Sequence, residues 1–281
     1  MKKKIVLSLI ILVLLGAGFV AYHYISQAVL IKEANKTALK MDQITEEINI
    51  EDLSTYFNGN KGSFVLFDKD QNSYTVFNEE QSQYRDSPCS TFKILNSLIG
   101  LETKVLEDEN TLIKWNGKHN YIDSWNKDHT LATAFSNSVV WYYQEVAAKV
   151  GKEKMQSFLK EAAYGNSDLS GGLTKFWLVS SLRISPLEQV VFLRKFYSYD
   201  LPFSANNIDI VKKIMVISKE DNGITLSGKT GSAGDNLSWF VGYVEKDKNV
   251  YFFATKIEGK IAASSPARRI TEAILRDKKL L

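Results

Sequence analysis

The sequence predicts an α+β fold in which one antiparallel β-sheet is flanked by helices and carries a helical subdomain. Apolar runs of strand length occur early in the chain, at 63–77, and again in the last third, at 224–255. Helix-like segments fill most of the interval, and strands at both ends of a helical stretch indicate a single sheet with a helical insertion. With 281 residues, 44% of them apolar, the chain can bury a sizeable core, and we expect one domain with an N-terminal appendage.

The N-terminus has the pattern of an export signal. Three lysines at 2–4 precede an apolar run from Ile5 to Ala21, and a small-x-small sequence follows at 26–28. The run is at the short limit for a membrane-spanning helix, so cleavage with secretion and retention as an anchor are both open. We expect residues 1–28 to be a signal peptide or membrane anchor and the protein to be exported, either to the outer face of the cell membrane or as a secreted form.

The domain elements follow from local patterns. Residues 29–57 are polar and are expected to form a spacer that leads into a domain at 58–281. Two apolar runs on either side of 68–72 predict a β-hairpin. Ser185 and Glu188, with Pro186 between them, form a capping-box sequence at a helix start. Helices are predicted within 88–101, from 141, and at 153–162, 185–197 and 265–276, and strands at 224–227, 238–244 and 250–255, with turns at 228–231 and 245–249.

The composition argues against several function classes. The net charge is +3 and no basic run beyond residues 2–4 forms a stripe, so we expect no nucleic-acid partner. The histidines, His23, His119 and His129, show no metal-ligand spacing, so no metal is expected. The single cysteine, Cys89, cannot form an intramolecular disulfide, and we interpret it as a small buried apolar residue.

A candidate nucleophile lies in the stretch from Ser87 to Leu101. Ser90 and Lys93 are three residues apart, so at a helix start their side chains share one face. A serine hydroxyl needs a base, and a lysine is a base only if its pKa is depressed. Burial among the neighbouring apolar side chains is expected to depress the pKa of Lys93. The same spacing occurs twice more in the chain, so this pair alone does not identify a catalytic site.

Two further motifs follow in a set order. Ser138-Val139-Val140 precedes a helix, where the simplest interpretation of Ser138 is an N-cap, and Lys229-Thr230-Gly231 lies among the predicted strands. His129 between them is interpreted as structural, because it has no serine or thiol partner nearby in the sequence. The order Ser-x-x-Lys, Ser-x-Val, Lys-Thr-Gly is that of penicillin-recognising serine enzymes.

The chain resembles one family of that superfamily closely, the class D serine β-lactamases or oxacillinases. The resemblance covers about Tyr56 to Ile274 and rests on SPCSTFKILNSLIGLE, SVVWYYQ, YGN, FWL followed by LRISPLEQ, GKTG and SWFVGYVE. It implies a serine β-lactamase/transpeptidase-like fold and makes 58–281 a class D catalytic domain. It also implies hydrolysis of the β-lactam amide bond, with β-lactam antibiotics as ligands and resistance to them as the result.

The resemblance implies the following catalytic roles. Ser90 is acylated by the lactam, and its backbone N–H and that of Ser232 hold the oxyanion. Lys93 carries a carbamate made from carbon dioxide or bicarbonate, N6-carboxylysine, which is the general base; no other cofactor is implied. Ser138 and Lys229 pass a proton to the departing nitrogen.

Other positions are implied to support this chemistry. Trp177 donates its indole N–H to the carbamate, and Val140 helps to keep the pocket dry. The Lys229-Thr230-Gly231 strand faces the substrate carboxylate. Arg268 is a candidate for the same carboxylate, although the Ala267-Arg268-Arg269 stretch is shifted by about one residue from the family's usual arginine. Cys89 stands where the family usually has a small inert residue, and we expect it to be tolerated.

Three other functions are compatible with parts of the pattern. A membrane-tethered β-lactam sensor or penicillin-binding domain is acylated but not turned over; such sensors resemble longer chains with a His-Glu-x-x-His region and tend to have a polar residue in place of Val140. A cell-wall transpeptidase or carboxypeptidase typically lacks the pattern of Tyr164-Gly165-Asn166 and Phe176-Trp177-Leu178. A Ser-His-Asp hydrolase would use His119 or His129, but no Gly-x-Ser-x-Gly elbow is present. Among all these functions, we expect the class D β-lactamase that hydrolyses its substrate.

Overall fold

The computed structural model describes residues 20, 25, 28–29, 31–234, 236–259 and 265–281. The chain forms two compact units, Met1–Thr37 and Ala38–Leu281. Most of the expected signal peptide or anchor at 1–28 lies outside the described residues. Among the residues that are described, no helix has both the length and the apolar character needed to cross a membrane.

The second unit is built on a mixed β-sheet. Its strands are ordered β1-β3-β2-β9-β8-β7-β6 within the described residues, and all neighbours are antiparallel except β1 and β3. The predicted sheet and its hairpin, β2–β3, are therefore confirmed, with one parallel edge pair added. The strands are β1 (Glu47–Ile50), β2 (Lys61–Asp68), β3 (Ser73–Phe77), β6 (Val216–Lys219), β7 (Thr225–Ala233), β8 (Leu237–Lys246) and β9 (Asn249–Glu258); β4 (Leu112–Ile113) and β5 (His129–Thr130) form a separate pair.

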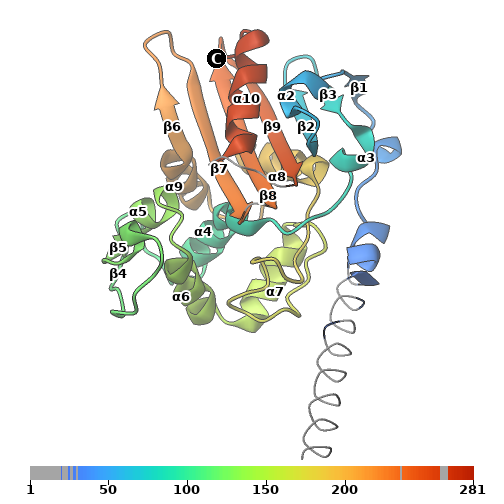
Figure 1. Cartoon of the computed structure of the whole chain (residues 1–281). Helices are drawn as coiled ribbons and strands as arrows, with labels where there is room; N and C mark the ends of the chain where they lie inside the picture. Colours follow the sequence, from blue (N-terminus) through green and yellow to red (C-terminus); the bar gives the residue numbers. More distant parts are fainter. Residues whose placement is uncertain (1–19, 21–24, 26–27, 30, 235, 260–264) are drawn as a thin grey trace, which may run out of the picture. The chain divides into compact units, whose positions relative to one another are not determined.

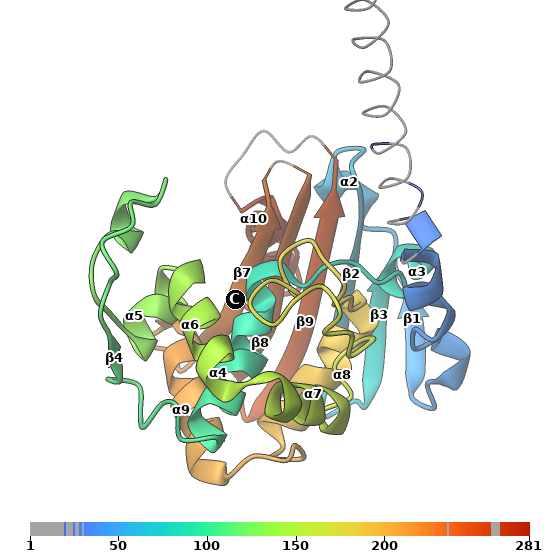
Figure 2. The ribbon, with the colours of Figure 1, turned by 90° about the horizontal axis from the view of Figure 1, so that it is seen from below.

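Helices cover both faces of the sheet (Figure 1). Side chains alternate along β2, so Phe64 and Leu66 pack in the cluster that contains α10, while Val65 and Phe67 pack in the larger cluster that contains α4 and α8. Figures 1 and 2 show α5, α6 and α7 grouped around α4 as a helical subdomain away from α10. The helices are α2 (Ser54–Phe57), α3 (Glu79–Ser82), α4 (Lys93–Glu102), α5 (Leu131–Ser136), α6 (Val140–Val150), α7 (Lys152–Glu161), α8 (Pro186–Tyr197), α9 (Ala205–Met215) and α10 (Pro266–Asp277), with 3₁₀ turns η1 (Met41–Gln43), η2 (Cys89–Phe92) and η3 (Asp123–Trp125).

Local sequence signals place several elements correctly. The capping box of α8 is present: Glu188 N donates to Ser185 Oγ at 3.2 Å, and Ser185 N donates to Glu188 Oε2 at 2.9 Å. The predicted helices at 153–162 and 265–276 correspond to α7 and α10.

Two expectations differ from the structure. The spacer was expected to extend over 29–57, but the compact unit begins at Ala38 and β1 joins the sheet beside β3. The turn expected at 228–231 is wrong, because these residues lie inside β7 and pair continuously with β8. Gly228 is required there by crowding: a Cβ at this position would lie 2.8 Å from Val241 O.

Candidate active site

The Ser90 and Lys93 side chains are in contact. Ser90 lies in the 3₁₀ turn η2, and Lys93 is the first residue of α4, so the chain tightens before the α-helix begins. Lys93 Nζ donates to Ser90 Oγ at 2.7 Å. Lys93 is completely buried, whereas Ser90 is partly exposed. The predicted pair is therefore assembled, with its hydroxyl accessible and its amine inside the protein.

The surroundings of Lys93 favour a neutral amine. Burial lowers the pKa of Lys93 well below its usual value, and the nearby Lys229 cation lowers this pKa further. The Tyr143 ring centroid lies 5.3 Å from Nζ, and Ser97 Oγ donates to the Lys93 carbonyl at 2.7 Å. An amine held neutral can accept a proton or act as a nucleophile, which an exposed ammonium group cannot do.

Strand β7 lies directly against the nucleophile turn. A Cβ at Gly231 would lie 3.2 Å from Ser90 N and 2.9 Å from Pro88 O, so only glycine permits this approach without displacement of the turn. Gly231 pairs with Trp239 of β8, which holds the strand in register. The Lys-Thr-Gly motif is thereby brought next to Ser90, and Ser232 follows as an exposed residue of the same strand.

Lys229 is the second buried lysine of the site. Its side chain is 5% exposed, and burial lowers its pKa to about 8. Lys229 Nζ donates to Thr230 O at 3.1 Å and lies 5.7 Å from the Phe135 ring centroid. Near neutral pH this group therefore carries a positive charge that is easily lost as the pH rises.

Ser138 lies between α5 and α6 in a left-handed conformation. Its φ of 56° is uncommon for a residue other than glycine, and its N–H donates to Phe135 O at 3.1 Å. The N-cap of α6 is Val139, without a side-chain cap bond, so the interpretation of Ser138 as the helix cap is wrong. Val140, the first residue of α6, is half-buried. A strained, partly exposed serine is typical of a functional position rather than of a helix cap.

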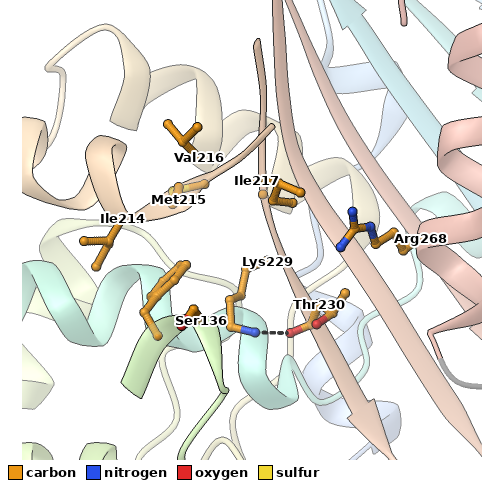
Figure 3. A pocket seen from close by; sticks show the side chains of 10 residues that line it. Ser136, Ile214, Met215, Val216, Ile217, Lys229, Thr230 and Arg268 are labelled. Atoms are coloured by element: carbon orange, nitrogen blue, oxygen red, sulfur yellow. Dashed lines mark hydrogen bonds between the residues drawn. The ribbon is translucent and has the colours of Figure 1, made fainter. Parts of the chain in front are cut away.

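A cavity of about 260 Å³ opens beside β7 (Figure 3). Lys229, Thr230 and Arg268 contribute its cationic and polar groups, and the junction of α9 and β6 contributes an apolar wall. Arg268 is bound to Glu272, with 2.7 Å between Nε and Oε1, and its side chain is 40% exposed. Ser90 and Lys93 do not line this cavity; β7 connects it to them. The lining residues are Phe135, Ser136, Ile214, Met215, Val216, Ile217, Gly228, Lys229, Thr230 and Arg268.

Trp177 presents an unused donor in the core. The ring is fully buried and packs on Phe92, the residue before Lys93, with 5.5 Å between ring centroids. Trp177 Nε1 has no hydrogen-bond partner among the described residues. A buried N–H without a partner is costly, so its retention calls for an acceptor that arrives with function.

Several contacts that support the site have no signal in the local sequence. Arg85 Nε donates to both carboxylate oxygens of Glu188, at 3.0 and 2.8 Å, and Arg85 Nη2 donates to Gly165 O at 3.1 Å. Gln189 Nε2 donates to Thr91 Oγ1 at 2.9 Å, which braces the residue after Ser90. These partners lie far apart in the chain, so their pairing follows from the fold alone.

Two further side chains with reactive groups, His129 and Cys89, are buried in the structure. His129 is buried and its ring nitrogens contact Thr133 Oγ1 at 3.1 Å and Ser124 O at 2.9 Å, as its structural interpretation requires. Cys89 is buried, as predicted, and burial raises the pKa of its thiol to about 11. Within the described part of the chain, no group of His, Cys, Asp and Glu side chains is arranged to hold a metal ion.

Comparisons with known proteins agree on one family. The model of the penicillin binding protein transpeptidase domain matches residues 28–276. The probable β-lactamase YbxI of Bacillus subtilis is 37% identical over 276 residues, which cover 98% of this chain and 97% of that protein. A crystal structure of a class D β-lactamase from Bacillus subtilis superposes with a TM-score of 0.79 at 39% identity, over 82% of this chain and 97% of that one.

A regulatory protein is also similar. BlaR1 of Bacillus licheniformis is 40% identical over 239 residues, which are 83% of this chain but only 39% of BlaR1. The chain spans that part of BlaR1 and, in contrast, nearly the whole of YbxI. The chain therefore belongs to the penicillin-binding protein transpeptidase family and, within it, to the class D β-lactamases.

Proposed function

We propose that this protein hydrolyses β-lactam antibiotics through an acyl-enzyme on Ser90 and thereby confers resistance to them. The observation that carries the proposal is the 2.7 Å contact between Ser90 Oγ and the buried Nζ of Lys93. An accessible hydroxyl beside a base with a depressed pKa is the arrangement needed for nucleophilic attack on a carbonyl.

The proposed reaction has two stages. In the first, Ser90 Oγ gives its proton to the base at Lys93 and forms a bond to the lactam carbonyl carbon. The ring C–N bond breaks, and the nitrogen takes a proton passed on by Ser138 and Lys229. Backbone N–H groups of Ser90 and Ser232 stabilise the negative oxygen of the tetrahedral state. In the second, water adds to the Ser90 ester and releases a carboxylic acid, and the hydroxyl regains its proton.

We propose further that Lys93 is modified by carbon dioxide. Neutral Nζ bonds to the carbon of carbon dioxide and releases one proton, and burial supplies the neutral amine that this needs. Trp177 Nε1, which has no hydrogen-bond partner within the described part of the chain, fits a carboxylate acceptor on Lys93. Once formed, the carbamate supplies a general base of moderate strength in an apolar pocket.

Substrate orientation is assigned to the cavity beside β7. β-Lactams carry a carboxylate near the scissile bond, and Lys229, Thr230 and Arg268 provide cationic and hydroxyl groups for it. Since Gly231 places this strand against the Ser90 turn, the bound carboxylate lies on the same side as the nucleophile.

A β-lactam sensor is the second candidate, because the ligand domain of such a protein needs acylation without hydrolysis. The similarity of this chain to BlaR1 supports the alternative. The half-buried Val140 favours the hydrolase, since a polar group at this position is what the sensors tend to have. The two functions differ in the fate of the Ser90 ester.

A turnover experiment separates them. Purified protein is mixed with a chromogenic cephalosporin, and the product is counted per enzyme. Product beyond one equivalent supports the hydrolase. In that case Ser90→Ala should form neither the product nor the penicillin adduct that mass spectrometry detects on the wild type. A burst of one equivalent followed by a stable adduct supports the sensor, and an adduct on Ser90→Ala removes Ser90 as the nucleophile.

We also propose that the protein is exported, with its domain outside the cell membrane and the N-terminal segment as a tether if that segment stays uncleaved. The lysines at 2–4 and the apolar run that follows support this location. Cell fractionation followed by N-terminal sequencing tests it. A mature chain that begins near Val29 would show release in place of tethering.

A further inference from the structure

We propose that Ser87 is a positioning residue that fixes residues 176–179, here named the Trp177 loop, against the nucleophile turn and thereby sets the affinity of Lys93 for carbon dioxide. The inference rests on the Lys93 modification described under the proposed function. It assigns to Ser87 no contact with substrate and no step of the chemistry.

One hydroxyl holds the loop at two points. Ser87 Oγ donates to Trp177 O at 2.9 Å and accepts from Val179 N at 2.9 Å. The bonds lie on either side of Leu178, so they close the backbone of the loop around Ser87. Ser87 is 1% exposed, so water cannot replace these bonds if the hydroxyl is removed.

The backbone of Ser87 is anchored from the sheet. Trp239 Nε1 donates to Ser87 O at 3.0 Å, and Trp239 is the β8 partner of Gly231. Gly231 in turn lies against Ser90 N. The nucleophile turn, the Lys-Thr-Gly strand and the Trp177 loop therefore all connect through Ser87, three residues before the nucleophile.

The loop conformation depends on such an anchor. Val179 has a φ of 51°, which is an outlier for a β-branched residue, and its side chain is exposed, so packing does not hold it there. A strained backbone persists only where surrounding bonds determine it. Without the Ser87 bonds, the backbone at Val179 is free to relax toward negative φ, and Trp177 moves with it.

Displacement of Trp177 shifts the equilibrium between the carbamate and the free amine of Lys93. Trp177 Nε1 is a buried donor that finds no partner among the residues that the structure describes, and its ring packs on Phe92 next to Lys93. A carboxylate on Lys93 that loses this donor is less stable, and the bond between Nζ and carbon breaks to return carbon dioxide and, with one proton taken up, the amine. The affinity for carbon dioxide therefore falls while the fold is retained.

The test measures this affinity without substrate. The full-length protein is titrated with ¹³C-bicarbonate, and the intensity of the carbamate resonance gives an apparent dissociation constant for carbon dioxide. We expect Ser87→Ala to weaken it roughly tenfold, the effect of one lost hydrogen bond to a charged group. Ser87→Thr, which keeps the hydroxyl, should retain most of the affinity for carbon dioxide. Ser87→Cys, whose thiol is a weak donor, should have an intermediate affinity. It takes the place of Ser87→Ala in the test if Ser87→Ala does not fold.

Ser181 provides a matched control. Its hydroxyl also bridges a loop, donating to Asp168 O at 2.9 Å and accepting from Gly171 N at 2.9 Å, and the side chain is similarly buried. Ser181→Ala should lose comparable stability and keep the affinity for carbon dioxide within twofold. An equal loss of affinity in both variants would overturn the specific role of Ser87.

A double-mutant cycle shows whether Ser87 acts through Trp177. Trp177→Phe removes the donor, so adding Ser87→Ala to it should weaken carbon dioxide binding no further. Additive effects would contradict the inference, as would unchanged affinity in Ser87→Ala. A wild-type protein with no carbamate resonance would overturn the Lys93 modification and this inference together, while turnover at Ser90 would still stand on its own measurement.

Discussion

Lys229 is expected to be a destabilising residue that is retained for function. Replacing it with the similarly long but apolar Met should therefore raise the stability of the protein at pH 7. Burial lowers the pKa of Lys229 from 10.5 to about 8, a difference of about 2.5 pH units, which corresponds to about 3 kcal/mol of preference for the neutral form. The bond from Nζ to Thr230 O offsets about 1 kcal/mol of this. The expected net gain in Lys229→Met is about 2 kcal/mol, or a rise of roughly 4–8 °C in Tm.

The pH dependence of this gain is the sharper test. Since the folded-state pKa lies below that of the unfolded chain, the unfolded chain binds more protons between about pH 8 and pH 10.5. The wild type therefore gains stability relative to Lys229→Met as the pH rises through this window. The advantage of the variant should be complete below pH 8, vanish at about pH 9.5 and be reversed by about 1 kcal/mol at about pH 10.5.

The assay is chemical denaturation of both proteins at pH 7 and pH 10, with acylation by a penicillin measured in parallel. Lys154 on α7 is exposed, so Lys154→Met should change stability by less than about 0.5 kcal/mol at either pH. Acylation should slow in Lys229→Met and stay normal in Lys154→Met. A Lys229→Met protein that is less stable than the wild type at pH 7 would refute the reasoning. So would a difference in unfolding free energy between the two proteins that is the same at pH 7 and pH 10.

Three further predictions concern residues that support or line the site. Arg85→Met leaves the Glu188 carboxylate buried without its cation, so the free energy of unfolding should fall by about 3–5 kcal/mol; Arg85→Met combined with Glu188→Gln, which removes the charge but keeps an acceptor for Ser185 N, should regain much of it, and equal unfolding midpoints in wild type and single variant would contradict the pairing. Val140→Asp brings a carboxylate to the pocket that keeps Lys93 protonated, so stopped-flow traces should show acylation without steady turnover, whereas Val140→Ala should still turn over; steady hydrolysis by Val140→Asp would disprove this. Arg268→Gln should raise KM for carboxylate-bearing β-lactams roughly fivefold, and Arg269→Gln should not, because Arg268 lines the cavity; the reverse result would transfer the role to Arg269.

Signals that act within a few residues were enough to predict much of the fold. The hairpin β2–β3, the capping box of α8 and the strands β8 and β9 each follow from a short pattern of apolar, cap or turn residues. The contact between Ser90 and Lys93 also follows from their spacing. By contrast, β1 is an edge strand with mostly exposed side chains, so it has no apolar alternation by which it could be recognised.

The glycines of β7 show why other features could not be predicted. Two glycines within four residues favour a turn when only the local sequence is considered. In the structure, Gly228 and Gly231 are needed because β8 and the nucleophile turn approach the strand too closely for a side chain. Ser87 and Arg85 were missed for a related reason, since their partners are about 90 to 100 residues away in the chain.

The burial of Cys89 makes the protein suitable for site-specific labelling. A thiol pKa of about 11 leaves roughly one molecule in ten thousand as thiolate at pH 7, and the thiolate is the form that reacts with maleimides. Because Cys89 is the only cysteine in the sequence, the folded chain should behave toward such reagents as if it had none. A cysteine introduced at a fully exposed position such as Tyr121 would then carry a fluorophore or spin label alone, and changes in the surroundings of that label could be followed during acylation without removing any native residue from the core.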